Sequence, residues 1–455
     1  MRKGSLFAVL LALAAAPQPM AAARAAPGST IDQLVRPYAD THNFSGVILI
    51  ARGGAPLFTR AYGFADRERG ARNALNTRFH VASMSMQFTA AAALRLVNAG
   101  RLSLDTPVSD VIADFPNGRA ITIRHLLTQT SGIADINRNP DYSEVLKSHQ
   151  TPLSLIDKVR HLPPARKPGT YMGEEHSAYN LLALIIERKT GRPFAKAVKN
   201  LVFAPLGMGE SAIDDDSPSA RHNAAAGYEP KDLYDIAPAD RIHWSAKTGN
   251  ASAITTAIDE LKFVRGLYRR DFLKPELREL MFDPATPAAY GWFKSDSTRF
   301  GRRVLSMNGR SPGFASAMVY VPKDQLLIVV LSNIYASAPP EIASELAALN
   351  LGLPYERLSL RTTVDPASLV GLPADFRFPS NFYQPDAVVR IGVVDGAVSL
   401  HWPSGDTSPL IPTSKDHFID RAYWMPVEVV REAGAKIGQL KYGAFVGQPV
   451  VNTRP

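Results

Sequence analysis

Ser83 stands near the start of an apolar, alanine-rich stretch, residues 79–100, that has the composition of a buried helix. Apolar residues recur at helical spacing after it, and Gly100 supplies the stop that helices favour. The first turn of a helix carries unpaired backbone N–H groups and a positive pole, which stabilise an oxyanion. A serine placed there can act as a nucleophile in acyl transfer, although an N-cap serine is the alternative interpretation. Ser85 and Gln87 interrupt the same apolar turn and are candidates for binding substrate.

Several short motifs follow one another in a fixed order over residues 30–350. They are the runs 77–90, 100–108, 123–132, 168–170, 179–193, 205–208 and 312–314. This series resembles the serine β-lactamase and penicillin-binding-protein superfamily, and most closely its class C and esterase-like branch. The resemblance implies an α+β fold, in which an antiparallel sheet is flanked by helices and faces a helical subdomain across a cleft.

The resemblance also implies three catalytic motifs, and all three are altered in this chain. Ser83 takes the place of the nucleophile, but Met86 stands where active members have the lysine that helps to remove the serine proton. A thioether accepts no proton and carries no charge, so the usual activating partner is missing. Counting without a gap from the Pro-Gly-Thr motif puts Glu174 and His176 at the positions of a tyrosine and an asparagine. The third motif, residues 307–309, keeps only its glycine.

Glu174 and His176 are both groups that transfer protons. Their i, i+2 spacing on an extended loop directs both side chains to one cleft, and burying them without a role would cost free energy. The leading hypothesis is therefore a glycoside hydrolase acting on an envelope or periplasmic oligosaccharide, with Glu174 as general acid and Asp135 as the second carboxylate. The candidate substrate-binding residues are Gln87, Asn308, Arg310 and Ser85.

Two alternatives stay open beside this hypothesis. One is a rewired serine esterase or peptidase, in which His176 or Glu174 is the base for Ser83. The other is an inactive protein whose cleft binds a ligand without transforming it. Asp135 is equally interpreted as an N-cap or Asx-turn residue. We expect no metal and no cofactor at these residues, because the helix-borne His-Glu spacing of metallohydrolases is absent.

Residues 1–25 have the order of a secretory signal: basic residues, an apolar run and small residues before a cleavage point. The apolar run, residues 6–16, is too short to span a bilayer, and a chain without cysteine has no site for a lipoprotein anchor. We therefore expect a periplasmic or secreted protein without a membrane anchor. Loss of the leader lowers the net charge from +9 to +6, and basic runs interleaved with aromatic residues are absent, so no nucleic-acid partner is expected.

The remaining patterns predict the elements that position these residues. A helix over 31–38 and strands over 44–52 and 56–63 precede Ser83, and a mostly helical region follows from 103 to about 284. Strands return between 303 and 332, before a helix over 340–349. These elements make up an expected β-lactamase-like domain, residues 26–353. Short alternating segments in residues 354–455 predict a small β-rich domain.

Overall fold

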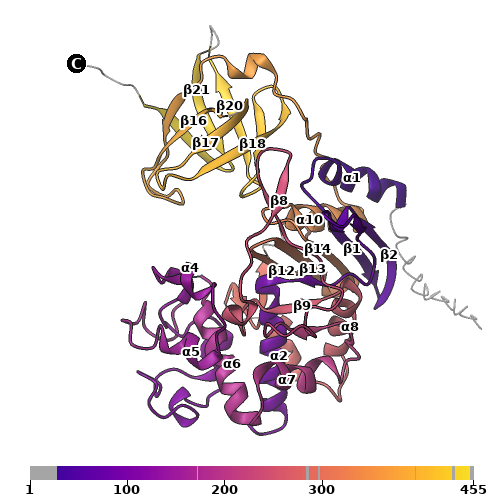
Figure 1. Ribbon diagram of the computed structural model, residues 1–455, viewed down its shortest axis with the longest axis vertical. Helices are drawn as coiled ribbons and strands as arrows, with labels where there is room; N and C mark the ends of the chain where they lie inside the picture. Colours follow the sequence, from indigo (N-terminus) through magenta and orange to yellow (C-terminus); the bar gives the residue numbers. More distant parts are fainter. Residues whose placement is uncertain are drawn as a thin grey trace, which may run out of the picture.

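The computed structural model describes residues 28–450, apart from Met172, 283–285, 296–297, Asp395 and 433–435. The expected leader, residues 1–25, lies outside the described residues. An α+β unit is followed by a closed β-barrel (Figure 1). This is the expected α+β fold with an additional β-rich domain. A membrane-spanning helix is absent from the described part of the chain, because no helix there combines the necessary length and apolarity.

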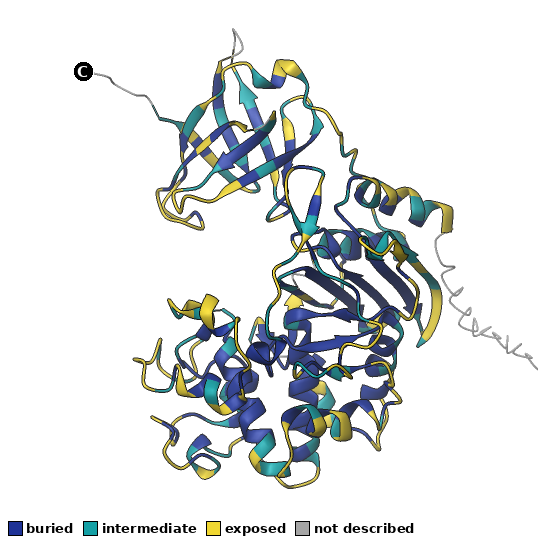
Figure 2. Cartoon of the chain, in the orientation of Figure 1, coloured by how far each residue is buried: buried dark blue, intermediate teal, exposed yellow. Residues whose placement is uncertain are grey.

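The α+β unit is built on a seven-stranded antiparallel sheet with the order β10-β11-β12-β13-β14-β1-β2. Its strands are β1 (Gly46–Arg52), β2 (Ala55–Tyr62), β10 (Ala288–Ala289), β11 (Trp292–Ser295), β12 (Val304–Ser311), β13 (Phe314–Val321) and β14 (Leu326–Ser332). Strands from both ends of the unit are thus neighbours, since β1 pairs with β14 along its whole length. The central strands are buried on both faces, and the edge strand β2 is largely exposed (Figure 2).

Alternation along the strands sends side chains into two separate cores. In β1, Ile48 and Ile50 pack with the helices α1 and α10, whereas Val47 and Leu49 belong to the larger core that contains α2. This follows from the period of two of a strand, which turns successive side chains to opposite faces. The ten helices of the described residues are α1 (Gly28–Asp40), α2 (Met86–Asn98), α3 (Ile123–Leu127), α4 (Tyr142–Val145), α5 (Pro152–Asp157), α6 (His176–Thr190), α7 (Phe194–Val198), α8 (Ala257–Leu267), α9 (Pro275–Phe282) and α10 (Pro339–Asn350).

The stretch around Ser83 is not one continuous helix. Phe79 and His80 form the short strand β5, a 3-10 turn η1 (Ala82–Ser85) follows, and α2 begins at Met86. The strand β5 belongs to a small sheet with β9 (Ala253–Thr255) and β6 (Ala212–Ile213). The other small sheets pair β3 (Phe64–Asp66) with β4 (Ala71–Arg72) and β7 (Tyr228–Pro230) with β8 (Ile236–Pro238). The remaining short helical turns used below are η3 (Ile136–Arg138) and η5 (Trp244–Lys247).

The carboxyl-terminal part of the described residues is a barrel of eight strands. They are β15 (Ala374–Arg377), β16 (Val388–Val394), β17 (Ala397–His401), β18 (Thr407–Ser414), β19 (His417–Asp420), β20 (Pro426–Arg431), β21 (Ile437–Tyr442) and β22 (Phe445–Pro449). Closure by β15 and β22 removes the exposed edges of the sheet. The predicted β-rich domain is therefore confirmed in kind, while its exact boundary stays a prediction.

The barrel is docked on the α+β unit by residues that follow β19. Arg421 is 1% exposed, and its guanidinium donates to the Asn43 side chain and to the backbone carbonyl of Asp232. The indole Nε1 of Trp424 donates to the carbonyl of Ala336 at 2.9 Å. Asp232 lies in the turn between β7 and β8, and this hairpin rises beside the barrel in Figure 1.

Candidate functional site

Ser83 lies in a turn that the sheet holds from one side. The preceding residue, Ala82, has φ 49°, a left-handed conformation that costs a residue other than glycine roughly 1–3 kcal/mol. On the sheet side, a Cβ added to Gly309 of β12 would lie 2.8 Å from the Ser83 nitrogen and 2.4 Å from the Val81 oxygen. The Ser316 hydroxyl also donates to that oxygen, at 2.8 Å. The surrounding strands thus impose a strained turn at the candidate nucleophile, which is a pattern typical of active sites.

The other polar residues of this turn are turned inward. The Ser85 hydroxyl donates to Ala82 O at 2.6 Å and accepts from Ala253 N at 2.9 Å, so it fastens the turn to β9. Gln87 is fully buried, and its amide donates to the carboxylate of Glu260. Ser83 is only half-buried, and within the described part of the chain nothing hydrogen-bonds its hydroxyl. The structure therefore does not bring Ser85 and Gln87 to an open surface beside Ser83.

Glu174, His176 and Asp135 form one connected chain of side chains. His176 is the first residue of α6, and its Nδ1 lies 3.1 Å from Asp135 Oδ2, which also accepts from the His176 backbone N–H at 2.9 Å. Its Nε2 faces Glu174 Oε2 at 3.6 Å. Asp135 caps η3 through its other oxygen, which accepts from Asn137 N at 2.8 Å. The interpretation of Asp135 as a capping residue thus fits the structure, and Asp135 also orients the His176 imidazole, a contact that the sequence patterns did not predict.

The pKa values of the two carboxyl groups are shifted in opposite directions. Burial raises the pKa of the Glu174 carboxyl above its usual 4.5, against the opposing charge of His176 and with a further contribution from Asp135. Burial also acts to raise the pKa of Asp135, but the hydrogen bond and charge of His176 outweigh it, and the pKa is lowered. His176 thus favours the ionised form of Asp135. The pKa of Glu174, by contrast, is raised from its usual value toward neutral pH.

Glu175 has a different partner set from its two neighbours. It is 2% exposed, and it accepts from the N–H groups of Ser131 and Gly132 and from the guanidinium of Arg166. These bonds hold the 131–132 loop against the start of α6. The alternation along this loop therefore separates a structural glutamate from the Glu174–His176 pair.

Asn308 and Arg310 lie on the face of β12 opposite to Gly309. Strand alternation turns Met307 and Gly309 toward the core that holds the Ser83 turn, whereas Asn308 is exposed. The Arg310 guanidinium donates to Ala422 O, a barrel residue, at 2.6 Å. The structure thus does not bring these two predicted substrate-binding residues together with Ser83.

Lys247 is a titratable group that the sequence interpretation missed. It is 8% exposed and ends η5, and its ammonium donates to the Tyr142 hydroxyl at 2.9 Å and lies 5.2 Å from that ring. Burial lowers the pKa of Lys247 to about 8. The residues after it contact both helices of the site, because Thr248 O accepts from Asn180 of α6 and Gly249 O accepts from Thr89 of α2. No local motif marks Lys247, since only this long-range packing brings it near α2 and α6.

Comparison with known proteins connects this geometry to a family. Residues 31–352 match the sequence profile of the family described as beta-lactamase. The chain is similar to a Bacillus subtilis (strain 168) protein described as the penicillin-binding protein PbpX, with 29% identity over 68% of this chain and 76% of that protein. It is also similar to a D-aminopeptidase of Gluconobacter oxydans (strain 621H), with 27% identity over 72% of this chain and 62% of that enzyme.

Solved structures extend the similarity beyond the α+β unit. The penicillin-binding protein of Bacillus halodurans matches 70% of this chain and 98% of its own, with a TM-score of 0.61 and 28% identity. The octameric penicillin-binding protein homologue of Pyrococcus abyssi matches 92% of this chain and 99% of its own, with a TM-score of 0.65 and 22% identity. The second match shows that the fold is shared over more of the chain than the family profile covers.

The expected glycoside hydrolase is wrong. The family profile and the D-aminopeptidase relative contradict it and favour the alternative of a serine esterase or peptidase. The geometry gives a physical reason, because Asp135 and Glu174 contact opposite nitrogens of one imidazole. The His176 ring thus fills the space between two carboxyl groups that a glycosidase would leave open for its sugar.

Proposed function

Because the chain belongs to the β-lactamase family, we propose that it is a serine hydrolase that cleaves small amides or esters through Ser83. The relatives that are penicillin-binding proteins or D-aminopeptidases favour a peptide-like acyl group, with a D-amino acid residue as the first candidate. The observation that carries the proposal is the Glu174–His176 pair, which supplies proton-transfer groups where the resemblance places the tyrosine and asparagine. In this proposal, these groups take over proton transfer from the lysine that the resemblance places at position 86. Met86, which stands there instead, is 2% exposed and packs in the main core.

In the proposed reaction, Glu174 is the general base. Its carboxylate takes the proton of the Ser83 hydroxyl while Oγ forms a bond to the acyl carbon. The protonated Glu174 then gives this proton to the leaving nitrogen or oxygen as that bond breaks, which leaves an acyl-enzyme. In the second half, Glu174 takes a proton from water as the water oxygen bonds to the acyl carbon, and it returns this proton to Ser83 Oγ as the acyl–Oγ bond breaks and the acid is released. A pKa raised by burial suits both halves of this cycle.

The other groups act by position and charge. The Ser83 backbone N–H, at the start of the η1–α2 segment, is the proposed donor to the oxyanion. His176 is a positioning residue, because Asp135 fixes its ring through Nδ1 and its backbone N–H while Nε2 faces Glu174. Asp135 fixes the tautomer in the same way that a carboxylate orients a triad histidine.

Labelling and turnover of the full chain test this proposal. The protein is treated with a fluorophosphonate probe and assayed on p-nitrophenyl acetate, D-alanine p-nitroanilide and a chromogenic cephalosporin. We expect labelling and hydrolysis of at least one substrate, and both are lost in Ser83→Ala. Ser103→Ala, an exposed serine outside the turn, is the control and should retain full activity. Absence of labelling and of turnover in the wild-type protein would contradict the proposal and favour the alternative of an inactive protein.

A further inference from the structure

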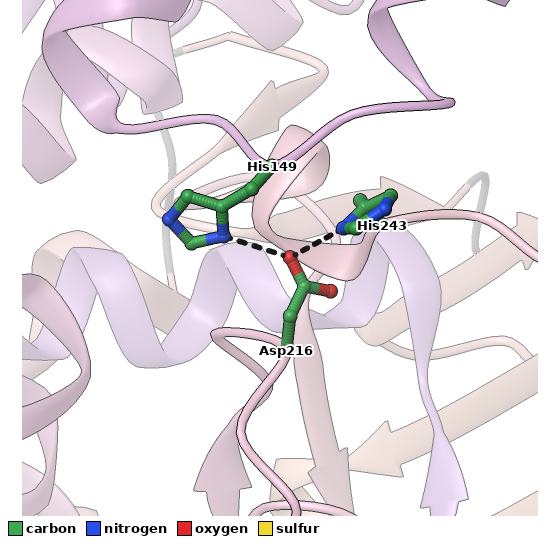
Figure 3. A group of neighbouring side chains, drawn as sticks. All are labelled: His149, Asp216 and His243. Atoms are coloured by element: carbon green, nitrogen blue, oxygen red, sulfur yellow. Dashed lines mark hydrogen bonds and ion pairs between the residues drawn. The ribbon is translucent and has the colours of Figure 1, made fainter.

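Two histidines lie against one oxygen of the Asp216 carboxylate. All three residues are distant in sequence from Ser83. His149 Nδ1 lies 3.0 Å and His243 Nδ1 lies 3.2 Å from Asp216 Oδ2. The three atoms all lie within 4.8 Å of one another (Figure 3). They come from three segments, namely the connection between α4 and α5, the loop after β6, and the residue before η5. Among the described residues, this is the only group of at least three such side chains whose ligand atoms meet so closely.

The carboxylate at the centre is held in place by a backbone N–H group and by the Arg221 side chain. Asp216 Oδ1 accepts from Trp244 N at 2.8 Å and from the Arg221 guanidinium at 2.7 Å. The Asp216 N–H donates to Asp214 Oδ1 at 2.8 Å, and the residue has φ 70°, in the left-handed region. These contacts occupy one oxygen and leave Oδ2 directed at both imidazoles. A fixed oxygen between two rings is a preorganised ligand set.

We propose that His149, Asp216 and His243 bind a divalent transition-metal ion of the zinc type through Nδ1, Oδ2 and Nδ1. Two imidazole nitrogens and one carboxylate oxygen are ligands typical of zinc, which binds them at about 2.0–2.2 Å and takes water at a fourth position. Magnesium and calcium prefer all-oxygen sites, so the nitrogen pair disfavours them. His149 and His243 have side-chain exposures of 58% and 44%, which gives an ion and its water access to the site.

The bound ion would join the connection between α4 and α5 to the segment that carries Lys247. Trp244 follows His243 directly, and its ring stacks on His80 with centroids 3.7 Å apart. His80 lies in β5, three residues before Ser83. The metal therefore links the connection between α4 and α5 to the residues that pack beside the Ser83 turn, so its role is structural. This inference does not depend on the proposed hydrolase activity.

Zinc titration of the full chain tests the site. After treatment with a chelator and its removal, ZnCl2 is added in a calorimeter, and the melting temperature is measured with and without the ion. We expect one ion per chain with a dissociation constant in the micromolar range or below, and a melting temperature raised by a few degrees. MgCl2 at the same concentration should produce neither effect.

Matched variants locate the binding. His149→Ala and His243→Ala should each weaken zinc binding by at least about tenfold, since each removes one ligand. His222→Ala removes an exposed histidine close by in the sequence and should bind zinc as the wild type does. His149 has its side chain hydrogen-bonded only to Asp216 among the described residues, so its variant is expected to fold. Zinc binding that is absent from the wild type, or equal in both ligand variants and the wild type, would overturn the proposal.

Discussion

At the scale of single residues, the proposed reaction at Ser83 depends on Glu174, a carboxyl group whose pKa is raised by burial. If Glu174 is the base, the reaction needs its ionised form, so kcat/KM should rise with pH along a limb whose midpoint lies above 4.5. Glu174→Gln should remove this limb and lower kcat/KM by about 100-fold, the usual weight of one acid–base group. The control is Glu144→Gln, an exposed glutamate on α4. An unchanged limb in the Glu174 variant would point to His176 as the base.

A second carboxyl group bears on stability rather than catalysis. Glu260 is fully buried, and burial raises its pKa to about 8, opposed by the hydrogen bond from Gln87. Its Oε1 has no hydrogen-bond partner among the described residues. Between pH 4.5 and 8 the folded protein holds a proton that the unfolded chain has released. The free energy of unfolding should therefore fall by a few kcal/mol as the pH rises through this window.

Glu260→Gln isolates this effect, because glutamine can keep the contact with Gln87 without a charge. We expect the variant to melt about 2–5 °C above the wild type at pH 8, and close to the wild type at pH 4.5. Differential scanning fluorimetry at the two pH values provides the measurement. A difference of the same size at both values would show that the change acts through packing instead of ionisation.

At the scale of elements, β12 sets the position of the nucleophile turn. A methyl group at position 309 would meet the backbone of Val81 and Ser83 at 2.4 and 2.8 Å, and neither can move without shifting the turn. Gly309→Ala should therefore lower kcat by more than about tenfold while the protein stays folded. The reason is that moving a reacting group by about 1 Å strongly lowers the reaction rate. Gly209→Ala is the matched control, because a Cβ there meets open space. Equal activity of the two variants would contradict this role of β12.

The sequence patterns predicted five of the seven strands of the sheet and its flanking helices, but neither the edge strands β10 and β11 nor the details of the site. The alternating and helical periods of the sequence were enough to predict β1, β14 and α10, because the apolar side chains of these elements pack into the two cores. The 3-10 turn before α2 was missed, since the contacts of β9 and β12 impose it and the local apolar pattern is the same for both helix types. Lys247 and the histidine pair around Asp216 carry no spacing signal at all, because long-range packing brings them together. The inward direction of Gln87 likewise depends on Glu260, which is 173 residues away.

At the scale of the whole molecule, the barrel and the α+β unit share an interface that reaches the sheet. Trp424 belongs to the core cluster of α1 and α10, with its ring 5.5 Å from Tyr38. Ala422, two residues earlier, accepts the hydrogen bond from Arg310, which is the neighbour of Gly309 on β12. The barrel thus supports the strand that holds the Ser83 turn. This arrangement predicts that the two parts unfold together as long as the interface is intact.

Trp424→Ala tests that coupling. The change removes a large buried ring and the bond to Ala336, and it should cost about 3–5 kcal/mol of interface stability. Scanning calorimetry should then show two transitions in the variant where the wild type shows one, because the parts no longer stabilise each other. Tyr423→Ala, at a neighbouring side chain that is 60% exposed, should leave the single transition in place. If both variants melt in one step at similar temperatures, the parts are coupled elsewhere, and the buried Arg421, with its bonds to Asn43 and Asp232, is the next residue to replace.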